Sequence, residues 1–272
     1  MAGQPREPGR TTTSRVLAIL ETFESAPGPL QLTDIATTAG LPLSTVHRLV
    51  AELEQWGALQ RGPDGRYQVG IRLWEIGQNA GRRLRDIVHP PLQDLFDLTH
   101  ETVHFAVRRG TEVIYVDRIY GSRRVPRIAR VGARLPLHPT AVGKVLLAYE
   151  EDWFREAYLA HALERRSRYT ITDPRRLARE LEVVREDGYA QTQEEIALGL
   201  CSVAVPVRAP RGDVVAAVGI VLPSVRFAEI PRFLPSMRGT VVRLEKLFRG
   251  LPQPVEQAIR TFWLGSSVER KQ

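Results

Sequence analysis

The amino-acid sequence predicts a multidomain protein in which a mainly helical N-terminal domain precedes an α+β domain with an antiparallel sheet. Its 272 residues are enough for two modest domains, each with its own hydrophobic core. Apolar residues recur at helical spacing through most of residues 14–80, with one turn-rich interruption. From about residue 89, strand-like runs are joined in pairs by short turns and separated by helices, which is typical of antiparallel α+β domains.

The N-terminal region contains helical stretches around one short hairpin. A first helix over residues 14–25 ends before the breaker Pro27-Gly28-Pro29. Helices over 32–40 and 41–59 follow, and helical spacing resumes after the turn-rich residues 61–70. We divide the chain into a disordered basic tail (1–12), a winged helix-turn-helix domain (13–75), a linker helix (76–88), an α+β domain (89–250) and a C-terminal tail (251–272).

The helix-turn-helix assignment depends on the spacing within residues 34–59. Ala36 is small enough for two helices to cross closely, and Gly40 can adopt the positive φ that ends the first helix. Pro42 suits the first turn of the next helix, where its missing N–H costs nothing. On that helix a buried stripe leaves polar side chains facing outward near the N-terminal end, where a recognition helix meets bases and phosphates: Ser44, Thr45, His47 and Arg48.

A tight hairpin flanked by arginines follows the second helix of this pair. Residues 61–67, RGPDGRY, have the turn chemistry of a wing, and Arg61 and Arg66 could straddle a phosphate backbone. An ordinary amphipathic helix pair or a protein-binding adaptor would explain the helices but not these arginines. The formal net charge of +7 agrees with a polyanionic partner, so we predict binding to double-stranded DNA.

The second domain alternates strands with helices. Strands are expected at 102–108, 113–119, 202–208 and 214–222, and helices at 139–150, 152–163, 174–187 and 229–249. The longest apolar run, residues 214–222, is far shorter than the roughly 20 residues that span a bilayer. With no apolar segment near the N-terminus and a single cysteine, Cys201, we expect a cytoplasmic protein without membrane partners.

The run His100-Glu101-Thr102-Val103-His104 matches the H-E-x-x-H pattern of zinc proteases. That pattern has a mechanism only on a helix, where both imidazoles share one face. Here the residues after Glu101 alternate as in a strand, so the two histidines should lie on either side of a helix-to-strand junction. We therefore predict no metal site and no cofactor.

An enzyme is the alternative to a regulator. Cys201 could act as a nucleophile with His138 or His104 as base, or His100 and His104 could hold a metal, giving a cysteine- or metal-dependent hydrolase. A lone cysteine in a predicted strand is more often an inert core residue. We predict no catalytic residues.

The ordered motifs resemble the IclR family of bacterial transcriptional regulators. In the first half these are DIA, GLPLSTVHRLV, WGAL, GRYQVG and LWEIG, and in the second TVHFAVRRGTEVIYVDRI, GARLPLHPTAVGKVLLA, EDGYAQTQEEIALGLCSVAVPV and AAVGIVLP. This resemblance covers about nine tenths of the chain. It implies a GAF-like effector-binding second domain and a homodimer or dimer of dimers.

The resemblance also implies an effector pocket. Carried over by position, the pocket falls on Ala141, Val142, Leu200, Ser202, Gly219 and Val221, with Thr192 as a further candidate. Many family members place a cysteine where this chain has Ser202, and strand alternation should point the neighbouring Cys201 to the opposite face. So apolar a set favours a larger, more apolar acid than the smallest keto acids. The predicted function is a ligand-responsive repressor, binding an inverted-repeat operator as a dimer and responding to a small organic acid.

Overall fold

The computed structural model describes residues 11–24, 26, 28–79, 82–121 and 129–251. Contacts between residues divide the chain into two compact units, Met1–Ala80 and Gly81–Gln272. The division falls inside the predicted linker over 76–88. That linker corresponds to the end of one helix and the start of another, and residues 80 and 81 between them are outside the described residues, as are nearly all of both predicted tails.

The first unit has the predicted order of helices and hairpin. Its elements are α1 (Thr12–Glu21), α2 (Leu32–Ala39), α3 (Leu43–Trp56), β1 (Leu59–Arg61), β2 (Tyr67–Val69) and α4 (Ile71–Asn79). The first helix ends earlier than predicted because Thr22 closes it: its N–H and its hydroxyl both donate to the carbonyl of Ile19, at 3.2 and 2.7 Å. The described residues before Pro27-Gly28-Pro29 therefore include a turn rather than more helix.

The turn between α2 and α3 has the expected chemistry. Gly40 has φ 62°, in the left-handed region. Its N–H donates to Thr37, and the N–H of Leu41 donates to Ala36 at 3.1 Å, so the last carbonyls of α2 are satisfied. Pro42 is extended and precedes α3 rather than lying within it.

The second unit contains a six-stranded antiparallel sheet in the order β5-β4-β3-β8-β7-β6. Its strands are β3 (Thr102–Arg109), β4 (Glu112–Ile119), β5 (Arg134–Pro136), β6 (Ala190–Gln193), β7 (Leu200–Arg208) and β8 (Val214–Pro223). Its helices are α5 (Arg82–Thr99), α6 (Ala141–Ala148), α7 (Asp152–Ala160), α8 (Pro174–Asp187), the 3-10 helix η1 (Ser224–Glu229) and α9 (Ile230–Arg249). The four predicted strands are present, whereas the two edge strands, β5 and β6, were not predicted.

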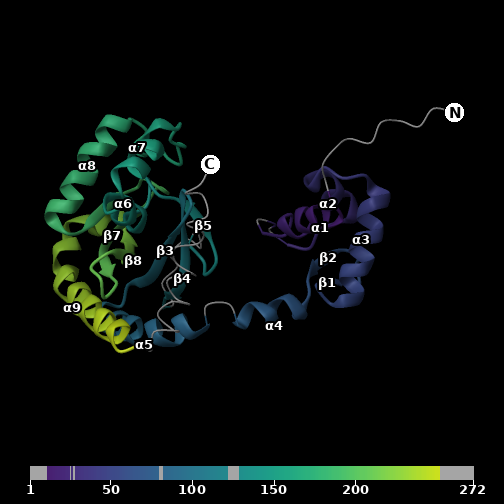
Figure 1. Ribbon diagram of the computed structural model, residues 1–272, viewed down its shortest axis with the longest axis horizontal. Helices are drawn as coiled ribbons and strands as arrows, with labels where there is room; N and C mark the ends of the chain where they lie inside the picture. Colours follow the sequence, from purple (N-terminus) through teal and green to yellow (C-terminus); the bar gives the residue numbers. More distant parts are fainter. Residues whose placement is uncertain (1–10, 25, 27, 80–81, 122–128, 252–272) are drawn as a thin grey trace. The chain divides into compact units, whose positions relative to one another are not determined.

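Helices cover both faces of this sheet (Figure 1). On one face α5 and α9 bury a core that includes Leu92, Phe105 and Leu244. On the other face α6 packs over a sheet surface of small residues, including Ala106, Ala204 and Ala217, and α8 packs against α6. Burying a large apolar side chain contributes about 1.5–3 kcal/mol, so both layers stabilise the sheet. The small residues let α6 approach the strands closely.

The H-E-x-x-H run lies at a helix-to-strand junction, as predicted. Helix α5 ends at Thr99, His100 has φ 55°, and β3 begins at Thr102. The two histidines therefore share no helical face. Within the described residues no group of three or more His, Cys, Asp or Glu side chains could hold a metal ion. None of the helices in the described ranges is both long and apolar enough to cross a bilayer.

Candidate functional sites

The predicted recognition helix α3 presents its polar residues on the surface of the first unit. Val46, Leu49 and Val50 are fully buried, which leaves Ser44, His47 and Arg48 exposed and Thr45 half-buried. The guanidinium of Arg48 lies 2.6 Å from the carboxylate of Glu52 one turn later, with both side chains 60% exposed. A pair this exposed contributes little to stability, so Arg48 can exchange Glu52 for another acceptor at small cost.

The wing arginines are oriented by contacts within the hairpin. Arg61 stacks over the ring of Tyr67 at 5.7 Å and donates to the Gly65 carbonyl at 3.4 Å. Arg66 lies 3.6 Å from the carboxylate of Asp64. Both arginines are exposed at the strand ends, where contacts to phosphate rather than to bases are expected.

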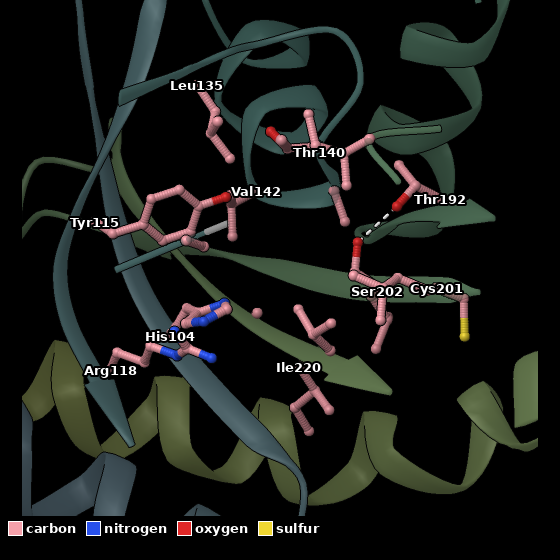
Figure 2. Close-up of a pocket in the computed structure, with 17 residues that line it drawn as sticks. His104, Tyr115, Arg118, Leu135, Thr140, Val142, Thr192, Cys201, Ser202 and Ile220 are labelled. Carbon is pink, nitrogen blue, oxygen red and sulfur yellow. Dashed lines mark hydrogen bonds between the residues drawn. The ribbon is translucent and has the colours of Figure 1, made fainter. Parts of the chain in front are cut away.

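The second unit contains a cavity between α6 and the sheet, with about 560 Å³ of unfilled space including its mouth. All seven predicted pocket residues line it: Ala141, Val142, Thr192, Leu200, Ser202, Gly219 and Val221. They converge from four elements, α6, β6, β7 and β8 (Figure 2). Binding of an effector in this cavity stays a prediction.

Strand register explains why these residues meet. Val221 pairs with Thr102 on one side and with Ser202 on the other, and Ser202 pairs with Thr192, so one row of side chains crosses the sheet. The hydroxyls of Ser202 and Thr192 lie 2.6 Å apart. Either can donate to the other, which leaves a hydroxyl hydrogen or lone pairs for a ligand.

A second row places a glycine beneath α6. Gly219 pairs with Ala204 and with His104. A Cβ atom added to Gly219 would lie 2.8 Å from Cγ1 of Val142, which is closer than van der Waals contact allows. The absence of a side chain at Gly219 is therefore what lets the first turn of α6 lie against the sheet.

The N-terminus of α6 opens into this cavity. The hydroxyl of Thr140 caps the helix by accepting from the N–H of Gly143 at 3.1 Å. Across the described residues, the N–H groups of Ala141 and Val142 donate no hydrogen bond. Unsatisfied amides at a helix N-terminus carry partial positive charge and favour an anion.

The cavity is also lined by four polar residues that were not predicted to belong to it: His104, Tyr115, Arg118 and Thr140. For His104, the two-residue alternation along β3 was sufficient to predict the face of the sheet on which it lies. With Val103, Phe105 and Val107 facing the α5 and α9 core, the intervening His104 must face the α6 side. The pocket is therefore more polar than the carried-over residues implied, and it contains one guanidinium.

Burial sets the protonation of this polar wall. It lowers the pKa of His104 to about 3, with the nearby charge of Arg118 as a second cause. Burial also raises the pKa of the Tyr115 phenol. Both groups are therefore neutral near pH 7 and can form neutral hydrogen bonds.

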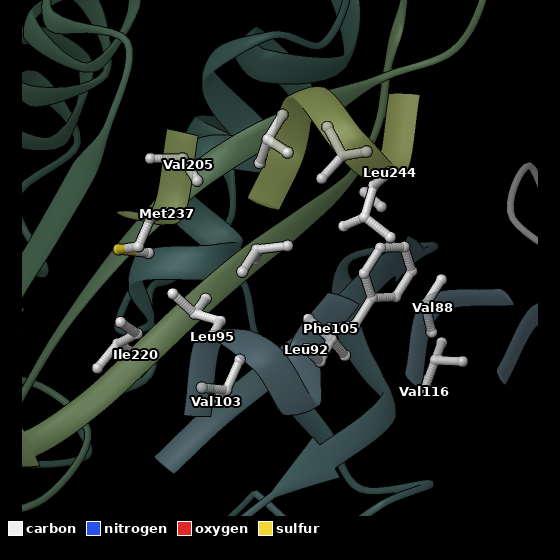
Figure 3. Close-up of a cluster of buried hydrophobic side chains, with 14 of the residues drawn as sticks. Val88, Leu92, Leu95, Val103, Phe105, Val116, Val205, Ile220, Met237 and Leu244 are labelled. Atoms are coloured by element: carbon white, nitrogen blue, oxygen red, sulfur yellow. The ribbon is translucent and has the colours of Figure 1, made fainter. Parts of the chain in front are cut away.

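Cys201 is among the residues that line the cavity, but its thiol points to the opposite face of the sheet, as strand alternation predicted. Its side chain belongs to the core between the sheet and the helices α5 and α9, part of which Figure 3 shows. Its thiol lies 3.4 Å from the Pro223 carbonyl, and burial raises its pKa to about 11. A thiol that stays protonated is a poor nucleophile.

His138, the other base considered for a hydrolase, does not lie with Cys201. Its two ring nitrogens lie 2.9 Å from the Tyr158 hydroxyl and 2.9 Å from the Glu164 carbonyl. Burial lowers the pKa of His138. Both ring nitrogens of His138 therefore have partners other than Cys201.

Two family models match the chain, each over one unit. The model of the IclR helix-turn-helix domain matches residues 12–63. The model of the bacterial transcriptional regulator IclR C-terminal domain matches residues 80–245.

Similar proteins are named as transcriptional regulators. The HTH-type transcriptional regulator XynR of Escherichia coli (strain K12) is 35% identical over 217 residues, covering 77% of this chain and 84% of the relative. The HTH-type transcriptional repressor AllR of the same strain is 31% identical over 239 residues, covering 86% and 87%.

Solved structures agree with this assignment. An IclR homolog from Microbacterium hydrocarbonoxydans, crystallised with 4-hydroxybenzoate, is 32% identical with a TM-score of 0.81, covering 89% of this chain and 100% of that chain. The IclR of Thermotoga maritima is 31% identical with a TM-score of 0.72, covering 87% and 98%. From its two matched domains, its relatives and its fold, the chain belongs to the IclR family of bacterial transcriptional regulators.

Proposed function

We propose that this protein is a ligand-responsive repressor that binds an inverted-repeat operator as a homodimer. Its affinity for the operator changes when a small organic acid occupies the cavity beside α6. One observation carries the effector part: the free amides of Ala141 and Val142 open into a walled cavity beside the Ser202 and Thr192 hydroxyls. In such a site the amides bind the carboxylate and the apolar wall encloses the rest of the ligand.

The DNA part is supported by the surface of the first unit. A helix with exposed Ser44, His47 and Arg48 near its N-terminal end fits a major groove, and the hairpin supplies Arg61 and Arg66 for the flanking phosphates. One of the relatives above is named as a repressor, which supports the direction of regulation proposed here.

Dimerisation is supported by α4. Ile71 and Trp74 are spaced to share one face of this helix, and they are 63% and 59% exposed. Large exposed apolar residues in one patch mark an interaction surface. A second copy is the occupant proposed, because an inverted-repeat operator requires two recognition helices related by twofold symmetry.

The lining of the cavity supports an aromatic carboxylic acid as the effector. Leu135, Ile196, Leu200 and Val221 form apolar walls, while the α6 amides favour an anion and the guanidinium of Arg118 disfavours a cationic compound. The Microbacterium relative holds such an acid, 4-hydroxybenzoate. Regulation requires the acid to prefer one state of the protein, and a coupling of about 1–3 kcal/mol would change operator affinity roughly 5- to 150-fold.

The substitution Ala141→Pro tests the anion site directly. Ala141 is the first residue of α6, where proline is tolerated, and Thr140 before it already has extended φ and ψ of −122° and 140°. The variant removes one N–H without breaking the helix. Calorimetry with a panel of aromatic and aliphatic acids should show weaker binding to Ala141→Pro than to wild type. The matched control Ala141→Gly retains the N–H and should bind normally. Equal binding by all three proteins would remove α6 from the anion site.

A further inference from the structure

His104 is a buried polar residue whose role the anion site does not explain. It lies on β3, it lines the cavity and it is 2% exposed. Its Nε2 atom is buried and forms no hydrogen bond within the described part of the chain. Buried polar atoms are nearly always hydrogen-bonded in folded proteins, so an unmatched one that lines a cavity points to a ligand group.

The neighbours of His104 direct its ring towards the cavity. On one side it pairs with Gly219, which has no side chain to cover the imidazole, and on the other with Arg118. The ring of Tyr115 meets it edge-on, with centroids 5.0 Å apart and planes at 70°. Figure 2 shows His104 on the sheet side of the cavity, across from Thr140 at the start of α6. A ligand whose carboxylate lies at α6 would therefore extend its other end towards His104.

The electrostatics of this wall limit the group that it can bind. A neutral imidazole carries one N–H and one lone pair, and which nitrogen holds the proton depends on the tautomer. The nearby guanidinium of Arg118 disfavours a cationic group such as an ammonium. A hydroxyl can donate to Nε2 or accept from it, so it satisfies this atom in either tautomer.

We infer that the effector has two polar ends, a carboxylate at the N-terminus of α6 and a hydroxyl that forms a hydrogen bond with Nε2 of His104. The inference rests on the proposed function and adds the ligand class, a hydroxylated aromatic acid. It also assigns His104 as the residue that distinguishes such an acid from its analogue without the hydroxyl.

Matched ligand pairs test this contact. The probes are 4-hydroxybenzoate with benzoate, and 4-hydroxyphenylacetate with phenylacetate, titrated calorimetrically into the full-length protein. In wild type, at least one hydroxylated acid should bind about three- to tenfold more tightly than its partner, the increment expected of one hydrogen bond. If no hydroxyl improves binding, the inference is wrong.

Three substitutions locate the increment at Nε2. His104→Phe retains an aromatic ring against Tyr115 but has no polar atom, and the hydroxyl should then give no advantage. His104→Gln places an amide near the position of Nε2 and should retain most of the advantage, whereas His104→Asn, whose amide reaches only the position of Nδ1, should not. Thermal unfolding of each variant establishes that it is folded. If His104→Phe does not fold, the comparison of His104→Gln with His104→Asn still decides the test.

The outcomes separate this inference from the function on which it depends. If every His104 variant weakens both members of a ligand pair equally, the histidine contacts the carboxylate and the proposed orientation is reversed, which overturns the inference. If no acid in the set binds wild type, both the inference and the anion site fail. If binding is lost in Ala141→Pro while the hydroxyl advantage is unaffected by His104→Phe, the anion site stands and the inference alone fails.

Discussion

Lys144 and Glu195 form a buried ion pair between α6 and the segment after β6, with Nζ and Oε1 2.6 Å apart. Lys144 is fully buried on α6, and Glu195 precedes Ile196, which lines the cavity. Lys144 also contacts the carboxylate of Glu180 on α8. This cluster joins α6, α8 and the segment after β6, so it positions two walls of the pocket.

Removing one partner of this pair should be strongly destabilising. Lys144→Met leaves Glu195 buried without its cation, which typically costs about 3–5 kcal/mol. The double variant Lys144→Met, Glu195→Gln should recover part of this loss, because it removes both charges. Lys246→Met, at an exposed site on α9, is the matched control and should change stability by about 0.5 kcal/mol or less. Urea unfolding measures all three, and a small effect of Lys144→Met alone would contradict the assignment.

The same pair should make stability depend on pH. Burial raises the pKa of the Glu195 carboxyl above 4.5, although the charge of Lys144 acts to lower it. The folded protein therefore binds this proton more tightly than the unfolded chain does. Glu195 should lower the free energy of unfolding as pH rises from about 4.5 through the raised folded-state pKa. In Glu195→Gln this decrease should disappear, and unfolding at a series of pH values compares the two proteins.

The contact between Gly219 and Val142 predicts a second pair of coupled substitutions. Gly219→Ala places a Cβ atom 2.8 Å from Val142 and should destabilise the fold by about 1–3 kcal/mol through overpacking. Adding Val142→Ala should relieve the clash and recover most of the loss. Gly239→Ala is the control, because a Cβ atom there meets nothing within 4 Å in a helix, and it should be neutral or slightly stabilising. Additive effects of Gly219→Ala and Val142→Ala in thermal unfolding would show that the contact is not limiting.

Arginines in the two parts of the first unit should differ in what they recognise. Arg48→Ala should weaken specific operator binding by about 1–3 kcal/mol if it contacts a base. Arg61→Ala and Arg66→Ala should weaken all sequences alike and reduce the salt dependence of binding. Glu52→Gln releases Arg48 from its ion pair and should leave operator affinity unchanged or higher. Fluorescence anisotropy at several salt concentrations distinguishes these results, and full operator affinity in Arg48→Ala would remove it from the base-reading set.

The H-E-x-x-H run should bind no metal. Its histidines come from the end of α5 and from β3, and His104 is used in the cavity wall. Elemental analysis of the purified, tag-free protein is expected to find no stoichiometric zinc. One tightly bound zinc per chain, lost in both His100→Ala and His104→Ala, would reverse this conclusion.

Local features of the sequence were sufficient for the helices and the longer strands. Gly40 and Pro42 define the turn before the recognition helix through backbone conformation alone, which depends on no distant residue. The alternation in residues 202–208 identifies β7, and the short continuous apolar run 214–222 identifies β8 as a buried strand, because both patterns are properties of the segment itself. The pocket residues on α6, β7 and β8 required the family resemblance in addition.

Tertiary structure decided what local patterns could not contain. The edge strands β5 and β6 have three and four residues, too few to show a period, and they exist because β4 and β7 offer them hydrogen bonds. His104 becomes a pocket residue only because β3 pairs with β8, more than a hundred residues later in the chain, and places it beside Gly219. The sequence by itself determined the helices, the longer strands and their apolar faces, since those follow from neighbouring residues. Which polar side chains share the cavity was decided by long-range strand register, which no local pattern records.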